Sequence, residues 1–133
     1  GSRLDALAEA LPRIESRWSK LNPAPTRKIP VLIGGGGEKK TLKLVAKHAD
    51  IWHSFATGDE LVHKLSVLAG HCDAVGRDIN EIEISNELRD KSVEDADSMR
   101  EQGITLFTLG ITGPEYDLTA AKQWLAWRDA QNG

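Results

Sequence analysis

This sequence of 133 residues has one cysteine, no long apolar run and no excess of positive charge. Its single cysteine, Cys72, cannot form a disulfide within the chain, so we expect a reducing, cytoplasmic environment. No apolar run approaches the roughly 18 residues that a bilayer-spanning helix needs, which predicts that the chain has no membrane partner. The net charge of -3 argues against a nucleic-acid partner, because the phosphate backbone attracts proteins with a strong cationic excess.

The start of the chain also lacks a charged-then-apolar leader of the secretory kind. Gly1 and Ser2, in place of a methionine, are typical of a tag remnant. We therefore expect the domain to cover residues 3–133 and the natural start to lie elsewhere. An apolar fraction of 40% and a charged fraction of 28% are those of an ordinary soluble globular protein, and the length predicts one domain or a piece of one.

The spacing of apolar residues predicts one helix followed by four strand–helix units. Apolar side chains three or four positions apart predict a helix from Leu4 to Leu21, with a kink at Pro12. The predicted strands are 29–33, 50–55, 82–85 and 104–109. The helices behind them are 38–49, 61–75, 92–99 and 118–125. Such alternation predicts an α/β fold with a parallel sheet and right-handed crossovers.

Local signals predict how several of these elements end and which side chains they bury. The stretch from Thr57 to Glu60 matches a capping box, Gly76 is placed as a C-terminal helix glycine, and Ser92 is placed as a second cap. Trp52 and Cys72 are expected in the core. In the last helix the side chains expected to face inward are Leu118, Ala121, Trp124 and Leu125.

Four consecutive glycines, Gly34 to Gly37, end the first predicted strand. That strand, 29–33, is apolar throughout, which is typical of a strand covered on both faces. At the start of the next helix, N–H groups without an intrahelical partner and the helix dipole form an anion site, and glycines let a phosphate approach the backbone closely. The run therefore predicts a phosphate cradle, with a hydroxyl donor from Thr41 and positive charge from Lys39 or Lys40.

The glycine run matches neither of two common nucleotide-binding motifs. Both the Walker A loop and the dinucleotide fingerprint place a glycine where Lys39 stands. A plain tight turn is the simpler interpretation. Four glycines exceed what a turn needs, however, because each costs up to about 1 kcal/mol relative to alanine.

The remaining polar residues give weaker signals. His53 ends the second predicted strand, where barrel ligands gather, and is expected either to line the pocket or to be a hydrogen-bonded loop histidine. His48 and His63 are expected on solvated helix faces. The four histidines and one cysteine show no metal-ligand spacing, so no metal site is predicted. No Gly-x-Ser-x-Gly elbow occurs, and no catalytic residue is assigned.

The segment PVLIGGGGEKKTLKLVAKHADIW (30–52) resembles the C-terminal hallmark of the luciferase-like oxidoreductase (luciferase-like monooxygenase) superfamily. It is most similar to members that use the deazaflavin coenzyme F420. The resemblance extends through HCDAVGRD (71–78) to LAWRDA (125–130). It implies a TIM barrel whose glycine-rich loop binds the phosphate of the cofactor side chain. The residues that it assigns to the loop are Gly34, Gly35, Gly36, Gly37 and Glu38, with Lys39 and Thr41 as further candidates.

A complete (β/α)8 barrel takes about 250 residues, so four strand–helix units preceded by a helix imply the C-terminal half of one. The resemblance places most catalytic residues in the N-terminal half, which has no counterpart here. We expect the parent protein to be an oxidoreductase that transfers hydride between F420 and an organic substrate. The isolated chain is expected to be inactive.

Three alternatives stay open. An FMN-dependent luciferase-like monooxygenase would use the same cradle for the phosphate of its flavin. A non-catalytic half-barrel would self-associate, since unpaired strand edges invite another chain, and we expect a homodimer or pairing with the missing N-terminal half. A complete doubly wound domain that binds a phosphorylated ligand would instead carry helices on both faces of its sheet.

Overall fold

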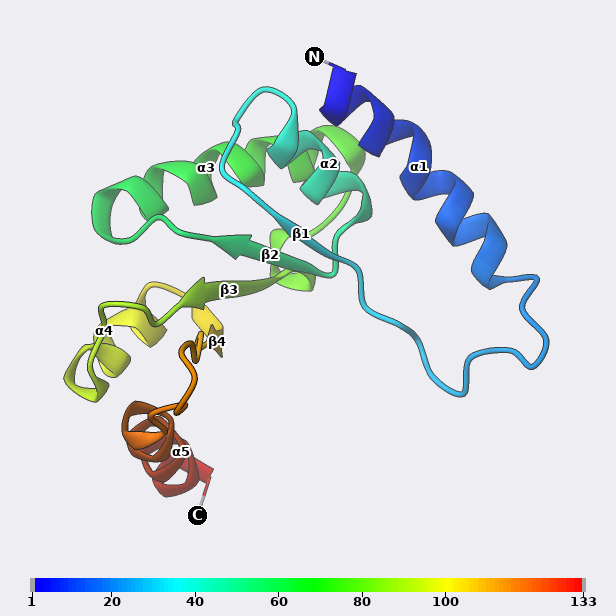
Figure 1. Cartoon of the computed structure of the whole chain (residues 1–133). Coiled ribbons are helices and arrows are strands. Elements are labelled where there is room, and N and C mark those ends of the chain that lie inside the picture. Colours follow the sequence, from blue (N-terminus) through cyan, green and yellow to red (C-terminus); the bar gives the residue numbers. More distant parts are fainter. Residues whose placement is uncertain (1, 133) are drawn as a thin grey trace.

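The computed structural model describes residues 2–132, in which four parallel strands form one sheet and five α-helices accompany it (Figure 1). The strands are β1 (Leu32–Gly34), β2 (Ile51–Ser54), β3 (Glu83–Glu87) and β4 (Ile104–Thr108). The helices are α1 (Ser2–Trp18), α2 (Thr41–His48), α3 (Gly58–Val75), α4 (Ala96–Glu101) and α5 (Thr119–Asn132). Two short 3-10 helices are η1 (Ile79–Glu81) and η2 (Val93–Asp95). The predicted α/β class and parallel sheet are confirmed.

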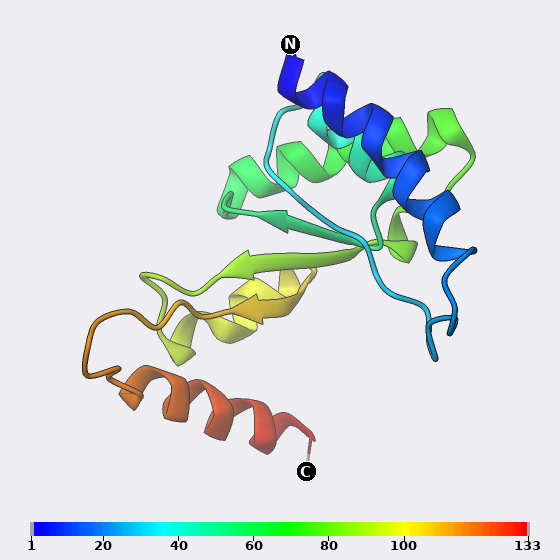
Figure 2. The same ribbon diagram turned by 45° about the vertical axis from the view of Figure 1, so that its right-hand side comes forward.

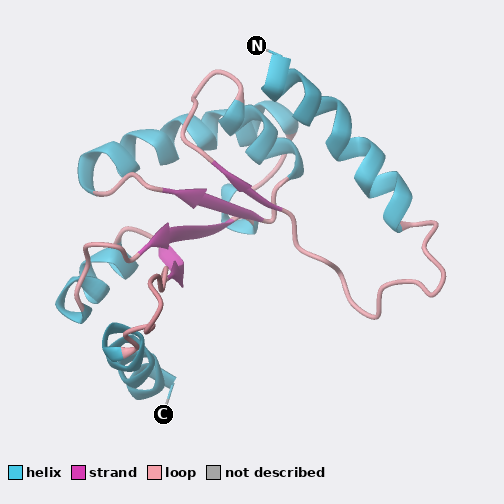
Figure 3. Cartoon of the chain, in the orientation of Figure 1, coloured by secondary structure: helices cyan, strands magenta, loops and turns pink. Residues whose placement is uncertain are grey.

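The strands lie in the sheet in the order β1-β2-β3-β4, which is also their order along the chain. Each crossover therefore leads to the neighbouring strand. Figures 1 and 2 show a curved sheet with the helices along its outer side, and Figure 3 shows the same separation of strands from helices by colour. A doubly wound domain would carry helices on both faces, and residues 2–132 do not have that arrangement.

Burial separates the two faces of the sheet. Ile33, Trp52, Ile84 and Ile104 lie side by side in the register, and each is no more than 7% exposed. Because side chains alternate between faces, the preceding residue in β1 belongs to the other face, and Leu32 there is 49% exposed. The helices thus cover one face, and the second face has no helix over it within residues 2–132.

The expectation that the first strand is buried on both faces is wrong. The strand begins at Leu32 rather than at residue 29, and Ile29 is itself 42% exposed. The apolar run 29–33 would be buried on both faces only if a second layer packed on the open face of the sheet. No described residue supplies that layer, so only Ile33 of β1 is buried.

The core lies between the sheet and the pair α2 and α3. Trp52, Leu42, Leu61 and Leu68 are fully buried there, which confirms the core position expected for Trp52. Cys72 is also fully buried, as expected. Burial raises the pKa of the Cys72 thiol above its ordinary value, so this cysteine is a packing residue with little thiolate character.

Helix ends follow the sequence signals in two cases out of three. Gly76 ends α3 in the left-handed conformation at φ 68°, and Ser92 forms a capping box with Asp95. The capping box expected at Thr57 is wrong, because the Thr57 side chain makes no capping hydrogen bond. The N–H of Gly58 is instead bonded to Oε1 of Gln102 at 2.9 Å, a partner 44 residues away.

The first helix runs through Pro12 and ends at Trp18 rather than at Leu21. It is fastened to α2 by two polar contacts. Nδ1 of His48 lies 3.0 Å from Oε1 of Glu15, and Nζ of Lys40 donates to Oδ1 of Asp5 at 2.6 Å. The solvated position expected for His48 is wrong, since its side chain is only 7% exposed against α1.

The side chains expected to face inward in the last helix are confirmed in part: Trp124 is buried and Ala121 is half-buried, but the two leucines are not. Trp124 is 8% exposed, and its ring lies 5.7 Å from the rings of both Phe107 and Trp127. Leu118 and Leu125, expected to face inward, are 46% and 47% exposed. The aromatic cluster of Phe107, Trp124 and Trp127 fixes the rotation of α5, so Leu125 faces outward, whereas Leu118 precedes the helix.

Candidate functional site

The glycine run forms the loop between β1 and α2, at the C-terminal edge of the sheet where parallel folds place ligands. Two hydrogen bonds hold its first residue onto β2. The N–H of Gly35 donates to the carbonyl of His53 at 3.1 Å, and Nε1 of Trp52 donates to the carbonyl of Gly35 at 2.8 Å. The loop therefore leaves the sheet from a fixed point.

Beyond Gly35 the loop presents a row of free donors. Within residues 2–132 the backbone N–H groups of Gly36 to Lys40 have no hydrogen-bond partner, and the first bond of the following turn is from Leu42 N–H to the carbonyl of Gly37 at 3.0 Å. Lys40, the N-cap residue, makes no side-chain capping bond. The residues of this stretch are exposed or half-buried. Five consecutive donors at a helix N-terminus form an arrangement suited to an anion.

The structure explains why three of the four glycines are glycine. Gly35 has φ 113°, a conformation that L side chains rarely adopt. A Cβ on Gly37 would lie 2.8 Å from Oγ1 of Thr41, and one on Gly36 would lie 3.2 Å from Cε of Lys64. At Gly34 the nearest atom would be 3.9 Å away, an ordinary contact. Gly35 is thus required by its backbone conformation, whereas Gly36 and Gly37 leave room for the side chains of Lys64 and Thr41.

The predicted cations and hydroxyl of the loop differ in their placement. Thr41 is 6% exposed at the first position of α2, and its hydroxyl lies beside Gly37. The side chain of Lys40 forms an ion pair with Asp5 on α1. Lys39 is exposed and makes no ion pair within residues 2–132. The threonine is therefore close to the free donors, whereas Lys40 is directed elsewhere.

Helix α3 supplies contacts to the loop that sequence reasoning missed. Nζ of Lys64 donates to the carbonyl of Gly36 at 3.1 Å, and Nε2 of His71 lies 2.8 Å from the carbonyl of Glu38. The carboxylate of Glu38 lies 3.3 Å from Nε2 of His63 and 3.6 Å from Nζ of Lys64. The Glu38 side chain, which the resemblance assigns to the cradle, is thus held against α3.

His53 lies next to the loop on the uncovered face. It is in register with Gly34 on one side and Ser85 on the other, and its Nδ1 lies 2.9 Å from Oγ of Ser85. Its ring meets that of Phe55 edge-on at 5.0 Å. The hydrogen bond agrees with one of the two expectations for His53, but the residue lies within β2 and not in a loop. That it lines a cofactor pocket stays a prediction.

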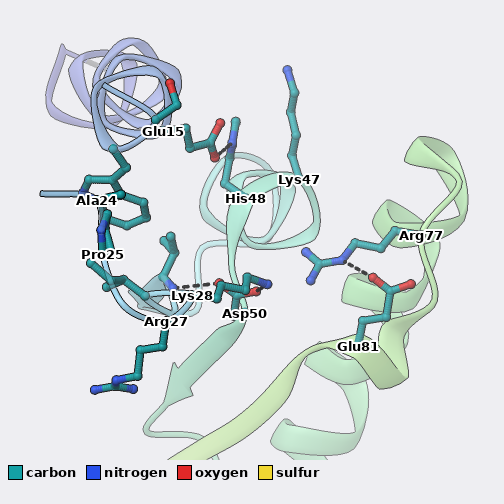
Figure 4. A pocket seen from close by; sticks show the side chains of 14 residues that line it. Glu15, Ala24, Pro25, Arg27, Lys28, Lys47, His48, Asp50, Arg77 and Glu81 are labelled. Carbon is teal, nitrogen blue, oxygen red and sulfur yellow. Dashed lines mark hydrogen bonds and ion pairs between the residues drawn. The ribbon is translucent and has the colours of Figure 1, made fainter. Parts of the chain in front are cut away.

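A hollow of about 660 Å³ lies at the N-terminal end of the strands, opposite the glycine loop (Figure 4). Its charged groups are largely paired with one another. Lys28 pairs with Asp50, and Arg77 pairs with Glu81 at 3.1 Å. Asp50 also accepts a hydrogen bond from the N–H of Val31 at 2.8 Å. Since these bonds tie the segment before β1 to the start of β2, this hollow is a structural junction.

No group of three metal-binding side chains comes together within residues 2–132. None of the described helices is both long and apolar enough to span a membrane.

Comparison with known proteins adds no relative. No family model, no curated protein and no solved structure matches this chain.

Proposed function

We propose that this chain is the C-terminal half of a (β/α)8 barrel from a coenzyme F420-dependent oxidoreductase, and that the β1–α2 loop holds the phosphate of the cofactor side chain. The observation that carries the proposal is the row of five unpaired N–H groups from Gly36 to Lys40. The similarity of segment 30–52 to the F420-dependent members of the luciferase-like superfamily supports the choice of cofactor.

The sheet supports the half-barrel. Four parallel strands in chain order, with helices along the outer side, are the repeating unit of such a barrel. The uncovered face would then be the barrel interior, which explains the exposure of Leu32. The glycine loop and His53 would lie together at the C-terminal mouth, where barrel enzymes bind their ligands.

The loop fits a phosphate group in shape and in charge. Gly36 and Gly37 place no side chain of their own over the donors, and the hydroxyl of Thr41 stands beside them. When bound, the deazaflavin would supply the ring that exchanges hydride with the substrate. The residues of this chain would bind the phosphate and so fix the cofactor at the mouth, and His53 would border the space beside the loop. FMN is the alternative ligand, because its phosphate requires the same donors.

Titration of the ¹⁵N-labelled chain with F420, and separately with FMN, tests this proposal. We expect amide shifts concentrated in residues 35–41. Riboflavin is the matched control ligand because it lacks the phosphate, and it is expected to leave these amides in place. The absence of any loop shift with both cofactors, or equal shifts with riboflavin, would contradict the proposal.

A second candidate function, a non-catalytic half-barrel that associates with another chain, is favoured by the sheet edges. The residues on either side of β1, Val31 and Gly35, both bond to the β2 segment, so in this stretch the odd-numbered residues face β2. The N–H and C=O groups of Leu32 and Gly34 therefore point away from β2 and have no described partner. β4 is the opposite edge and pairs only with β3. A sheet with two free edges is a template for further strands.

The charge of the open face bears on the choice of partner. A closed dimer of two copies would place two Glu83 side chains toward one enclosed interior, where like charges repel. A partner that carries cations on its inward face would pair with them instead. Pairing with a complementary N-terminal half is therefore the form of association that the charges favour over the homodimer.

A further inference from the structure

Lys64 lies closer to the glycine loop than its position in the sequence suggests. It stands on α3, 28 residues from Gly36, and its Nζ donates to the Gly36 carbonyl at 3.1 Å. Its side chain is 15% exposed, which is low for a lysine. The aliphatic part passes over the loop, since a Cβ on Gly36 would lie 3.2 Å from Cε and 3.4 Å from Cδ of Lys64.

The charge of Lys64 is shared between two carboxylates. Nζ lies 3.6 Å from Oε1 of Glu38 and 3.5 Å from Oε1 of Glu60. His63 also faces Glu38, but its side chain is 63% exposed. The ammonium group has three N–H donors, and only the Gly36 carbonyl lies within hydrogen-bond distance of it. It is therefore able to donate to a stronger acceptor, such as a phosphate oxygen.

The other lysines near the loop are less suited to the role. Lys40 is bonded to Asp5 on α1, and Lys39 is exposed at the surface. Lys64 is the lysine that is at once partly buried and bonded to the loop. A cation held in a partly desolvated position attracts an anion more strongly than an exposed one does.

We propose that Lys64 is the cation of the phosphate site, and that Glu38 and Glu60 hold it at the loop until the anion takes their place. This inference rests on the proposed function, because it assumes that the loop binds a phosphate group. It assigns the positive charge of the site to α3 and not to the lysines of the loop itself. Lys64 would then contact a phosphate oxygen while the N–H groups of Gly36 to Lys40 contact the others.

The competing role for Lys64 is a purely structural strap that keeps the loop in shape. The two roles differ in what happens when Glu38 loses its charge. Removing that charge strengthens anion binding in either role, because a carboxylate in the loop repels a phosphate. Part of the gain passes through Lys64 only if Lys64 binds the ligand, and the gain then shrinks when Lys64 is replaced by methionine. Glu38→Gln, compared in the wild type and in the Lys64→Met background, therefore separates the two roles.

The experiment compares FMN and F420 binding, followed by loop amide shifts, in the wild type, in four single variants of the full chain and in the double variant Glu38→Gln/Lys64→Met. Lys64→Met is expected to weaken binding about tenfold, the size of one lost charge-assisted hydrogen bond. Lys64→Arg is expected to restore most of the affinity, since it keeps the charge and the donors. Lys47→Met, which removes an exposed lysine at the far end of α2, is the matched control and is expected to stay within about twofold of wild type. Glu38→Gln is expected to bind about two- to fivefold more tightly.

Each outcome supports or overturns one statement. If the wild type binds neither cofactor, the proposed function and this inference both fall. Should the wild type bind and Lys64→Met bind equally well, the inference alone falls. If Glu38→Gln tightens binding as much in the Lys64→Met background as in the wild type, Lys64 is a strap and the proposal is wrong. Should Lys64→Met not fold, Lys64→Gln replaces it in both backgrounds and keeps the test decisive.

Discussion

A methyl group added at Gly34, Gly36 or Gly37 would in each case meet a different neighbour. At Gly37 the methyl would lie 2.8 Å from the hydroxyl of Thr41, a short, buried side chain that has little room to move. We expect Gly37→Ala to lower the free energy of unfolding by about 1–3 kcal/mol, the usual cost of overpacking, and to weaken phosphate binding. Urea unfolding and the cofactor titration measure the two effects.

Gly34→Ala is the matched control for that change. Its methyl would lie 3.9 Å from the nearest atom, and the residue is exposed at the end of β1. Its unfolding free energy is expected to stay within about 0.5 kcal/mol of wild type. An equal loss of unfolding free energy in the two variants would show that the contact with Thr41 is not what makes the loop sensitive to an added side chain.

Asp50 gives the chain a predicted response to acid. Burial acts to raise the pKa of its carboxyl, but the bonds from Lys28 and from the N–H of Val31 outweigh burial and leave the pKa below its ordinary value of 3.8. Because the folded pKa is lowered, the carboxylate stabilises the fold above pH 3.8 and loses this effect as the pH falls through the folded pKa.

The variant Asp50→Asn removes this response. It is expected to lose about 1 kcal/mol near neutral pH, mostly from weakening the bond to Val31, because the exposed Lys28 contributes little. Its deficit relative to wild type should shrink as the pH falls below 3.8. Urea unfolding at a series of pH values measures this, and a deficit that grows toward low pH would refute the assignment.

At the residue scale, the sequence predicts the loop but not what holds it. The glycines and Thr41 stand together in the chain, so local rules place them at the start of a helix. Lys64 and Ser85 lie 28 and 32 residues from the groups that they contact, Gly36 and His53. No spacing rule connects such positions, because only the packing of α3 and the pairing of β2 with β3 bring them near.

Among the elements, α5 depends on one aromatic cluster. Trp124 packs against Phe107 and Trp127 and is 8% exposed, whereas its neighbour Leu125 is 47% exposed. We expect Trp124→Ala to lower the free energy of unfolding by about 3–5 kcal/mol, as for other buried tryptophans. Leu125→Ala, the control, is expected to change it by no more than about 0.5 kcal/mol. Urea unfolding separates the two, and a larger loss at Leu125 would mean that α5 is rotated.

Sequence patterns located every element of the sheet but not always its exposed side. Four strands and their order of alternation with helices follow from apolar periodicity. The inward side of α5 does not, because leucines and tryptophans lie on more than one side of that helix and only the contact with Phe107 selects between them. The prediction that β1 is buried on both faces fails for a related reason. An apolar run shows that a strand is able to be buried on both faces, but the described residues contain no layer that covers the second face.

For the molecule as a whole, the two open edges predict association. In the absence of a complementary half, we expect the isolated chain to sediment as a species heavier than its 14.6 kDa monomer at micromolar concentrations. Its free edges would pair with those of other copies in open assemblies that do not enclose the Glu83 side chains. Leu32→Lys is expected to restore the monomer, since the residue lies on the open face beside an edge and is 49% exposed. Sedimentation velocity measures both states.

Ile111→Lys is the matched control for the association experiment. Ile111 is 38% exposed but follows β4 outside the strand. This variant is expected to sediment as the wild type does. A monomeric wild-type chain, or equal loss of association in the two variants, would rule out the sheet as the associating surface.

The hydrogen bond from Trp52 to Gly35 makes the loop optically observable. The indole is fully buried beneath the loop and donates to its first carbonyl, so its emission depends on whether that bond is intact. Replacing the other tryptophans, Trp18, Trp124 and Trp127, by phenylalanine would leave one fluorophore at this point. Loop movement on ligand binding could then be followed in real time by the intrinsic fluorescence of the chain, without any attached label.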